Sequence, residues 1–79
     1  MSVRQTIAAT FEQVAREQQR KLAPLRDGLK LLDSGLDSLS FALIVARLED
    51  SLGYDPFLAA ETFPVTFGDF VHLYEKDRK

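Results

Sequence analysis

The sequence predicts an all-α domain, a small four-helix bundle with a long first loop and a short third helix. Apolar residues recur at helical spacing in separate segments, and capping residues stand where those segments begin. We find no segment typical of a strand and no internal repeat. A chain of 79 residues is enough for one modest core. Residues 1-79 are therefore expected to form a single domain.

The first helix is expected from Val3 to about Lys21. Ser2 and Gln5, three residues apart, fit a capping box at its start. Basic residues at positions 20 and 21 suit the negative end of the helix dipole, and Pro24 excludes continuation. The apolar stripe recurs at spacings of four, four and three: Val3, Ile7, Phe11 and Val14.

A long connection, residues 22–37, follows the first helix. Connections of this length are uncommon without structure or function of their own. Its leucines predict that it packs onto the helices: Leu22, Leu25, Leu29, Leu31 and Leu32.

The second helix is expected from Ser38 to Leu52, because Asp37 is a good N-cap and Gly53 a good C-terminal stop. Asp55-Pro56 then predicts a short third helix, to about Glu61.

Phe63-Pro64 breaks the chain again before the last helix. Thr66 and Asp69 form a second capping pattern, and the helix is expected to run to about Lys76. Four of its residues are expected to face inward: Phe67, Phe70, Val71 and Tyr74.

The second helix is apolar on more than one side. At 100° per residue its core stripe contains Phe41, Ile44, Val45, Leu48 and Leu52. The opposite side holds Leu39, Leu43, Ala46 and Asp50. The two leucines there are expected to project from the wet face. Scattered surface leucines are normal, and the long connection could cover them. The sharper hypothesis is a partner-docking face next to the helix start.

The segment Asp33-Ser34-Gly35-Leu36-Asp37-Ser38-Leu39 delivers a serine to the first position of a helix. The Ser38 hydroxyl should point to solvent, where free N–H groups and the helix dipole favour an anion. The simpler alternative is a plain cap, with Asp37 and Ser38 serving structure only. We interpret the neighbours Ser34 and Ser40 as polar surface residues.

Gly35-Leu36-Asp37-Ser38-Leu39 resembles the attachment motif, G-x-D-S-L, of the phosphopantetheine-binding acyl, peptidyl and aminoacyl carrier proteins. The expected order and lengths of the helices are similar to that family over nearly the whole chain. Phe63-Pro64-Val65-Thr66 also resembles the family's entry to its last helix. The resemblance implies an acyl-carrier-protein-like fold, with 4′-phosphopantetheine attached covalently to Ser38 and Asp37 as the preceding acid.

The family resemblance also implies a non-enzymatic function. A phosphopantetheinyl transferase would modify Ser38 from coenzyme A with magnesium. An acyl- or aminoacyl-activating ligase or an acyltransferase would load the thiol as a thioester, and downstream synthase or transferase enzymes would use the cargo. The helix starting at Ser38 would recognise these partners through Leu39, Leu43, Ala46, Arg47 and Asp50. Carriers of bacterial fatty-acid synthesis have a more acidic second helix, so we expect a specialised pathway of fatty-acid, polyketide or nonribosomal peptide biosynthesis.

Charge and composition limit the other function classes. The net charge is −2; residues 1–32 carry six basic and three acidic side chains, whereas residues 33–79 carry four and nine. This distribution lacks the concentrated basic face that nucleic-acid binding needs. No run of about 18 apolar residues predicts a membrane span. The start does not resemble a secretory signal, so we expect a cytoplasmic protein.

A metal or catalytic centre is not expected. The chain has no cysteine, which excludes thiolate metal sites. His72 is its only histidine, so no cluster of histidines and no more than one His-containing triad can form. The acids lack the EF-hand spacing. His72 is expected at the surface.

The leading hypothesis is a monomeric, freestanding carrier protein, with Met1 at its start; a domain cut from a larger synthase is the alternative. An unmodified helical interaction module, docking through Leu39 and Leu43, is the second hypothesis. A helix-turn-helix DNA binder would need a basic recognition helix, and a self-contained enzyme is less favoured still. The cargo stays open, as does its shelter by a core of Phe11, Val45, Leu48, Phe70 and Tyr74.

Overall fold

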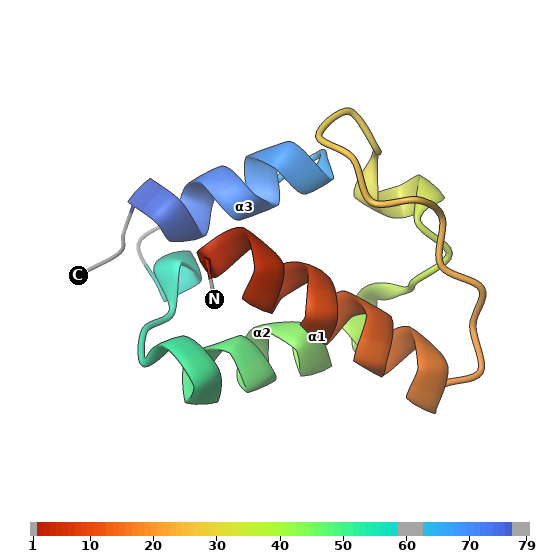
Figure 1. Cartoon of the computed structure of the whole chain (residues 1–79), viewed down its shortest axis with the longest axis horizontal. Coiled ribbons are helices and arrows are strands. Elements are labelled where there is room, and N and C mark those ends of the chain that lie inside the picture. Colours follow the sequence, from red (N-terminus) through yellow and green to blue (C-terminus); the bar gives the residue numbers. More distant parts are fainter. Residues whose placement is uncertain (1, 59–62, 77–79) are drawn as a thin grey trace.

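The structure is a computed structural model that describes residues 2–58 and 63–76. These residues form an all-helical, compact unit. Its α-helices are α1 (Val3–Glu17), α2 (Ser38–Leu52) and α3 (Phe67–Lys76), and its 3₁₀ turns are η1 (Leu31–Asp33) and η2 (Pro56–Leu58). Within the described ranges no strand forms; Lys30 and Thr66 make one isolated antiparallel bridge. α1 packs against both α2 and α3, and the long connection lies at the end of the molecule where α2 begins (Figure 1).

α1 begins as predicted and ends earlier. The Ser2 hydroxyl accepts from Gln5 N at 3.1 Å, and Ser2 N donates to Gln5 Oε1 at 2.9 Å, which confirms the capping box. The predicted end at Lys21 is wrong, because Gln19 turns into the left-handed region with φ of 56°. Gln19 N then donates to Arg16 O and Arg20 N to Ala15 O, the bond pair of a Schellman motif.

The bounds predicted for α2 are confirmed. Asp37 is the N-cap of the helix that starts at Ser38. Gly53 ends it with φ of 82° and donates its N–H to Glu49 O at 2.8 Å. A left-handed residue at this place satisfies a terminal carbonyl, and glycine adopts it without strain.

The start of α3 is also fixed by its cap. Asp69 N donates to Thr66 Oγ1 at 3.1 Å, and Thr66 N donates to Asp69 Oδ2 at 3.4 Å. These reciprocal bonds confirm the predicted capping pattern. The helix runs to Lys76, as expected.

Where the short third helix is predicted after Asp55, the described residues form only the 3₁₀ turn η2. Asp55 Oδ1 accepts from Phe57 N at 2.9 Å and so caps this turn. Pro56 to Leu58 is a 3₁₀ turn and not part of an α-helix. The rest of the predicted helix, to Glu61, falls outside the described residues.

The core is aromatic at its centre. Phe11 makes edge-to-face contacts with Phe67 and Phe70, with ring centroids 5.2 Å apart in each pair. The expected inward residues of α1 and α3 are confirmed, because all of them are buried: Val3, Ile7, Phe11, Val14, Phe67, Phe70, Val71 and Tyr74.

The long connection packs onto this core. Leu31 is only 2% exposed, and the leucines at positions 22, 25 and 29 are partly buried against the core. Leu32 differs from the expectation, because it is 89% exposed. Leu31 and Leu32 are adjacent in η1, so only one of them can face inward.

Candidate functional site

Ser38 occupies the first position of α2 and is exposed. Asp37 before it is in an extended conformation, and its Oδ1 accepts from Ser40 N at 2.9 Å. The first hydrogen bond within the helix runs from Phe41 N to Asp37 O. Helix geometry therefore leaves the N–H groups of Ser38 and Leu39 without an acceptor inside the helix. An exposed hydroxyl thus lies beside two free donors at the positive end of the helix dipole.

The loop before Ser38 is held by a chain segment far away in the sequence. Gly35 has φ of 96°, and a Cβ there would overlap the carbonyl oxygen of Lys21. Ala23 N also donates to Ser34 O at 3.0 Å. The backbone after α1 therefore runs directly against the Ser38 loop, and position 35 requires a glycine for both conformation and space.

The expectation that Ser34 and Ser40 are surface residues is wrong, because both have 0% exposure. Ser34 Oγ donates to Leu31 O at 2.6 Å and accepts from Leu36 N at 3.3 Å, so it closes the turn from inside. A serine followed by glycine is a signal for such local side-chain bonds to the backbone. Only Ser38, of the three serines in this region, is exposed.

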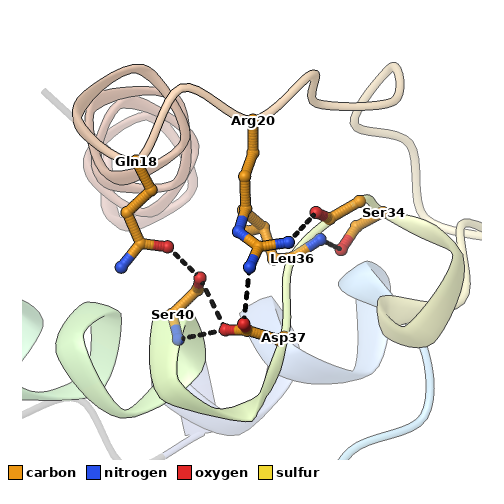
Figure 2. Close-up of polar contacts among 7 residues, drawn as sticks. Gln18, Arg20, Ser34, Leu36, Asp37 and Ser40 are labelled. Carbon is orange, nitrogen blue, oxygen red and sulfur yellow. Dashed lines mark hydrogen bonds and ion pairs between the residues drawn. The ribbon is translucent and has the colours of Figure 1, made fainter.

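A polar network joins the end of α1 to the start of α2 (Figure 2). Arg20 Nη2 lies 2.7 Å from Asp37 Oδ2, and Arg20 Nη1 lies 3.5 Å from Gly35 O. Ser40 Oγ contacts both Asp37 Oδ1, at 2.9 Å, and Gln18 Oε1. Because Ser40 has one hydroxyl hydrogen, it donates to one of these two acceptors at a time.

The network keeps Asp37 ionised. The backbone N–H of Ser40 and then its hydroxyl lower the pKa of the Asp37 carboxyl below its ordinary value, and the Arg20 charge adds to this. Hydrogen bonds and a nearby cation both favour the charged form. The N-cap is therefore an anion at neutral pH.

Ser38 is one of the residues that line an apolar groove of about 730 Å³. Three rings contribute to it: Phe57 and Phe63 stack with centroids 5.4 Å apart, and Phe41 lies 5.9 Å from Phe63. Its lining residues come from the connection, α2, η2 and the approach to α3: Lys30, Leu31, Leu32, Ser38, Phe41, Ala42, Val45, Phe57, Phe63, Pro64 and Val65. Of the core residues considered for cargo shelter, only Val45 lines it. Apolar grooves of this size hold small ligands in many proteins.

The groove was missed in the sequence because its wall is assembled from separate segments. Leu32, Val65 and Phe63 are 89%, 62% and 50% exposed. Grouped at one groove, exposed apolar residues are more informative than scattered ones. No sequence pattern indicated their exposure, and Leu32 was expected to pack onto the helices.

The predicted partner residues on α2 are not equivalent. Leu39 is 72% exposed, and Ala46 and Asp50 are exposed too. Leu43 is partly buried against the core, so the expectation that it projects into solvent is wrong. Arg47 is also partly buried.

Arg47 bonds to α1. Its Nη1 lies 2.8 Å from Glu17 Oε2 and its Nη2 lies 2.5 Å from Glu17 Oε1. Together with the Ser40–Gln18 contact, this shows that positions 40, 43 and 47 form the side of α2 that faces α1. Of the predicted core stripe, Phe41, Ile44 and Leu48 are buried, whereas Val45 and Leu52 are only partly buried.

The described part of the chain lacks the features of a metal site and of a membrane span. There, no group of three or more His, Cys, Asp or Glu side chains is placed to hold a metal ion. None of the described helices has the length and apolar character needed to cross a membrane. His72 is exposed, as expected.

Comparison of the chain with protein-family models, with curated proteins and with solved structures found no match.

Proposed function

We propose that this protein is a carrier that holds an acyl group as a thioester on a 4′-phosphopantetheine arm attached to Ser38. The observation that carries the proposal is the position of Ser38: it is an exposed serine, first in its helix, and it is one of the residues that line an apolar groove. Membership of the phosphopantetheine-binding carrier family is part of the proposal, and it rests on the motif from Gly35 to Leu39.

The start of α2 suits the charge of the attached group. A phosphodiester on Ser38 carries one negative charge, and the free N–H groups of Ser38 and Leu39 are donors for its oxygens. In the attachment, Ser38 Oγ forms a bond to the phosphorus next to pantetheine in coenzyme A. The phosphoanhydride bond breaks, adenosine 3′,5′-bisphosphate leaves, and the hydroxyl proton passes to a base of the transferase. The attached arm supplies a terminal thiol, which the chain lacks because it has no cysteine.

The groove favours an apolar acyl cargo over a charged aminoacyl one. Its lining is apolar except for Lys30 and Ser38, and burying an unpaired charge among phenylalanine rings is costly. A cargo tethered at Ser38 is attached to one of the residues that line the groove. Folding back would remove its hydrocarbon from water, at about 0.8 kcal/mol per buried methylene.

The proposal includes several further expectations. The partners are a phosphopantetheinyl transferase, an activating ligase or acyltransferase, and a downstream synthase or transferase. The four-helix arrangement is also included, with η2 as the described part of the short third helix. A monomeric, cytoplasmic carrier in a specialised biosynthetic pathway completes the proposal.

The test is the intact mass of the purified protein after incubation with coenzyme A, magnesium and a promiscuous phosphopantetheinyl transferase. Ser51→Ala is the matched control for Ser38→Ala, because Ser51 is another exposed serine of α2. The native protein and Ser51→Ala should gain one phosphopantetheine, and Ser38→Ala should gain none. No gain by a folded native protein with two different transferases would overturn the proposal.

The cargo class has its own test. The carrier is loaded with an acetyl or an octanoyl group, and amide, methyl and aromatic NMR shifts are compared. Octanoyl should shift Val45 and the Phe57 ring, which line the groove, and acetyl should leave them unchanged. Equal spectra would show that the cargo stays outside the groove.

An unmodified interaction module is the second candidate, favoured by the exposure of Leu39. In that case a partner would bind the native protein and Ser38→Ala equally well, and Leu39→Ala would weaken it. The partial burial of Leu43 leaves less of the docking patch expected for this function.

A further inference from the structure

We infer that Arg20 positions the Ser38 loop for modification and offsets the Asp37 charge beside the incoming phosphate. This inference rests on the proposed function and adds to it a residue outside the attachment motif. Arg20 lies in the turn after α1, 18 positions before Ser38 in the sequence.

One guanidinium group spans the loop that leads into Ser38. Its Nη2 bonds to Asp37 Oδ2 at 2.7 Å, and its Nη1 approaches Gly35 O at 3.5 Å (Figure 2). These acceptors lie on either side of Leu36, whose side chain is 5% exposed. Leu36 therefore anchors the loop from inside, and Arg20 anchors it from outside.

The two oxygens of Asp37 have different contacts. Oδ1 accepts from the N–H and the hydroxyl of Ser40 and so caps α2. Oδ2 accepts from Arg20. With one oxygen held by the helix and the other by Arg20, rotation of the carboxylate would break contacts at both ends. Ser38 follows directly on this fixed residue.

The turn at the end of α1 fixes the backbone position of Arg20. Its N–H donates to Ala15 O at 2.8 Å, and Gln19 before it takes φ of 56°. Gln18, in the same turn, contacts Ser40 with its side chain. The turn thus makes two separate contacts with the start of α2, on either side of Ser38 in the sequence.

Charge gives the second part of the inference. Modification places a phosphodiester anion one residue after the Asp37 carboxylate, and coenzyme A itself is a polyanion. Like charges this close repel each other. Within the described residues, Arg20 is the basic side chain that forms an ion pair with Asp37. Arginine suits this position better than lysine, because its planar fork donates to two acceptors at once.

The experiment measures the initial rate of Ser38 modification at several carrier concentrations by intact mass. Arg20→Gln removes both contacts and the charge, whereas Arg20→Lys keeps the charge alone. Arg16→Gln is the control, because it removes one exposed charge from the last turn of α1. We expect kcat/KM to fall about tenfold for Arg20→Gln, mainly through kcat, as for a misplaced nucleophile. Arg20→Lys should be intermediate, and Arg16→Gln should match the native rate.

A second readout does not use the transferase rate. Thermal unfolding of the unmodified and modified forms is compared for the native protein and for Arg20→Gln. Modification should lower the midpoint temperature of Arg20→Gln more than that of the native protein, because the added anion then lacks its counter-ion. In the Asp37→Asn background, the Arg20→Gln effect on both readouts should shrink.

The failures of the two proposals are distinguishable. If the native protein is not modified at all, the proposed function fails. If it is modified, and Arg20→Gln shows the native rate and the native difference between modified and unmodified forms, only the role of Arg20 is overturned. Circular dichroism of each variant shows whether a lost rate reflects a lost fold. If Arg20→Gln is unfolded, the rate of folded Arg20→Lys decides: a rate below the native one supports the role of Arg20, and the native rate overturns it.

Discussion

The backbone of Gly35 lies so close to Lys21 that a methyl group on residue 35 would overlap the carbonyl oxygen of Lys21. Gly35 also has a positive φ of 96°. The loop that presents Ser38 is therefore constrained twice at one residue, by conformation and by contact.

A series of glycine-to-alanine variants separates these two constraints. Gly28 has open space around it and no positive φ, and Gly53 has open space with φ of 82°. Gly35 has a positive φ and also no space for a Cβ beside Lys21. We expect Gly28→Ala to stabilise the protein by about 0.5 kcal/mol. Gly53→Ala should cost about 1 kcal/mol, and Gly35→Ala should cost more than about 2 kcal/mol. Urea unfolding measures all three, and equal losses for Gly35→Ala and Gly53→Ala would show that the contact does not matter.

The pH dependence of stability should change in Asp37→Asn. The pKa of the Asp37 carboxyl is lowered in the folded protein from its ordinary value of 3.8. Its stabilising effect is therefore complete above about pH 3.8 and is lost as the pH falls through the lowered pKa. Asparagine keeps an N-cap acceptor but cannot titrate.

We expect the native protein to lose stability faster than Asp37→Asn as the pH falls below 3.8, the ordinary pKa of the carboxyl. Urea unfolding at stepped pH values measures the difference between the two. The pKa of Glu17 is also lowered, by its bond to Arg47, but this contribution is common to both proteins and cancels. Parallel profiles would contradict the assignment.

Replacing Tyr74 by phenylalanine should not lower the free energy of unfolding. Its hydroxyl is buried without a hydrogen-bond partner among the described residues. Tyr74→Phe should therefore raise the free energy of unfolding by about 1 kcal/mol. Tyr54→Phe is the opposite case, because Tyr54 donates to Tyr74 O at 2.8 Å, and it should lose about 1 kcal/mol. Chemical denaturation of the two variants compares them, and a loss of stability in Tyr74→Phe would show that the hydroxyl is satisfied.

The same variant has an alkaline signature. Burial, with the charges of Asp55, Tyr54 and Glu49, raises the pKa of Tyr74 far above its ordinary value of 10.0. The stability linked to the neutral phenol is present below pH 10.0 and declines as the pH rises above it, since the unfolded chain ionises first. Tyr74→Phe should show a shallower decline above pH 10.0 in thermal unfolding experiments.

Leu39 and Leu43 should behave differently when shortened. Leu39→Ala removes a side chain that is 72% exposed, so stability should change by less than about 0.5 kcal/mol. Leu43→Ala removes a side chain packed against the core and should cost about 1–2 kcal/mol. Equal unfolding midpoints for the two variants would contradict the placement of α2 against α1. Under the proposed function, only Leu39→Ala should weaken a partner without weakening the fold.

The helix starts were predictable because their signals are local. Ser2 with Gln5, Asp37, and Thr66 with Asp69 each satisfy N–H groups within three residues, and all three caps form. The end of α2 was equally local, because Gly53 is the usual residue for a left-handed cap. The end of α1 was missed because Gln19, which is not a glycine, adopts that conformation.

The candidate site was predictable only in part. The position of Ser38 follows from Asp37 alone, but the burial of Ser34 and Ser40 depends on the segment after α1, which no local pattern reveals. Leu39 and Leu43 have similar angles on a helical wheel, and only the lateral position of α1 makes them different. The groove likewise depends on segments that meet only in the folded chain.

The contact between the Lys21 segment and the Ser38 loop means that part of what holds this loop lies outside residues 33–39. A peptide of residues 33–39 would contain every letter of the motif but neither Arg20, nor the Lys21 carbonyl, nor the rest of α2. Under the proposed function, a transferase that recognises the folded loop would modify folded chains in preference to newly made or misfolded ones. In that way attachment of the arm would report, molecule by molecule, that the carrier is ready to be loaded.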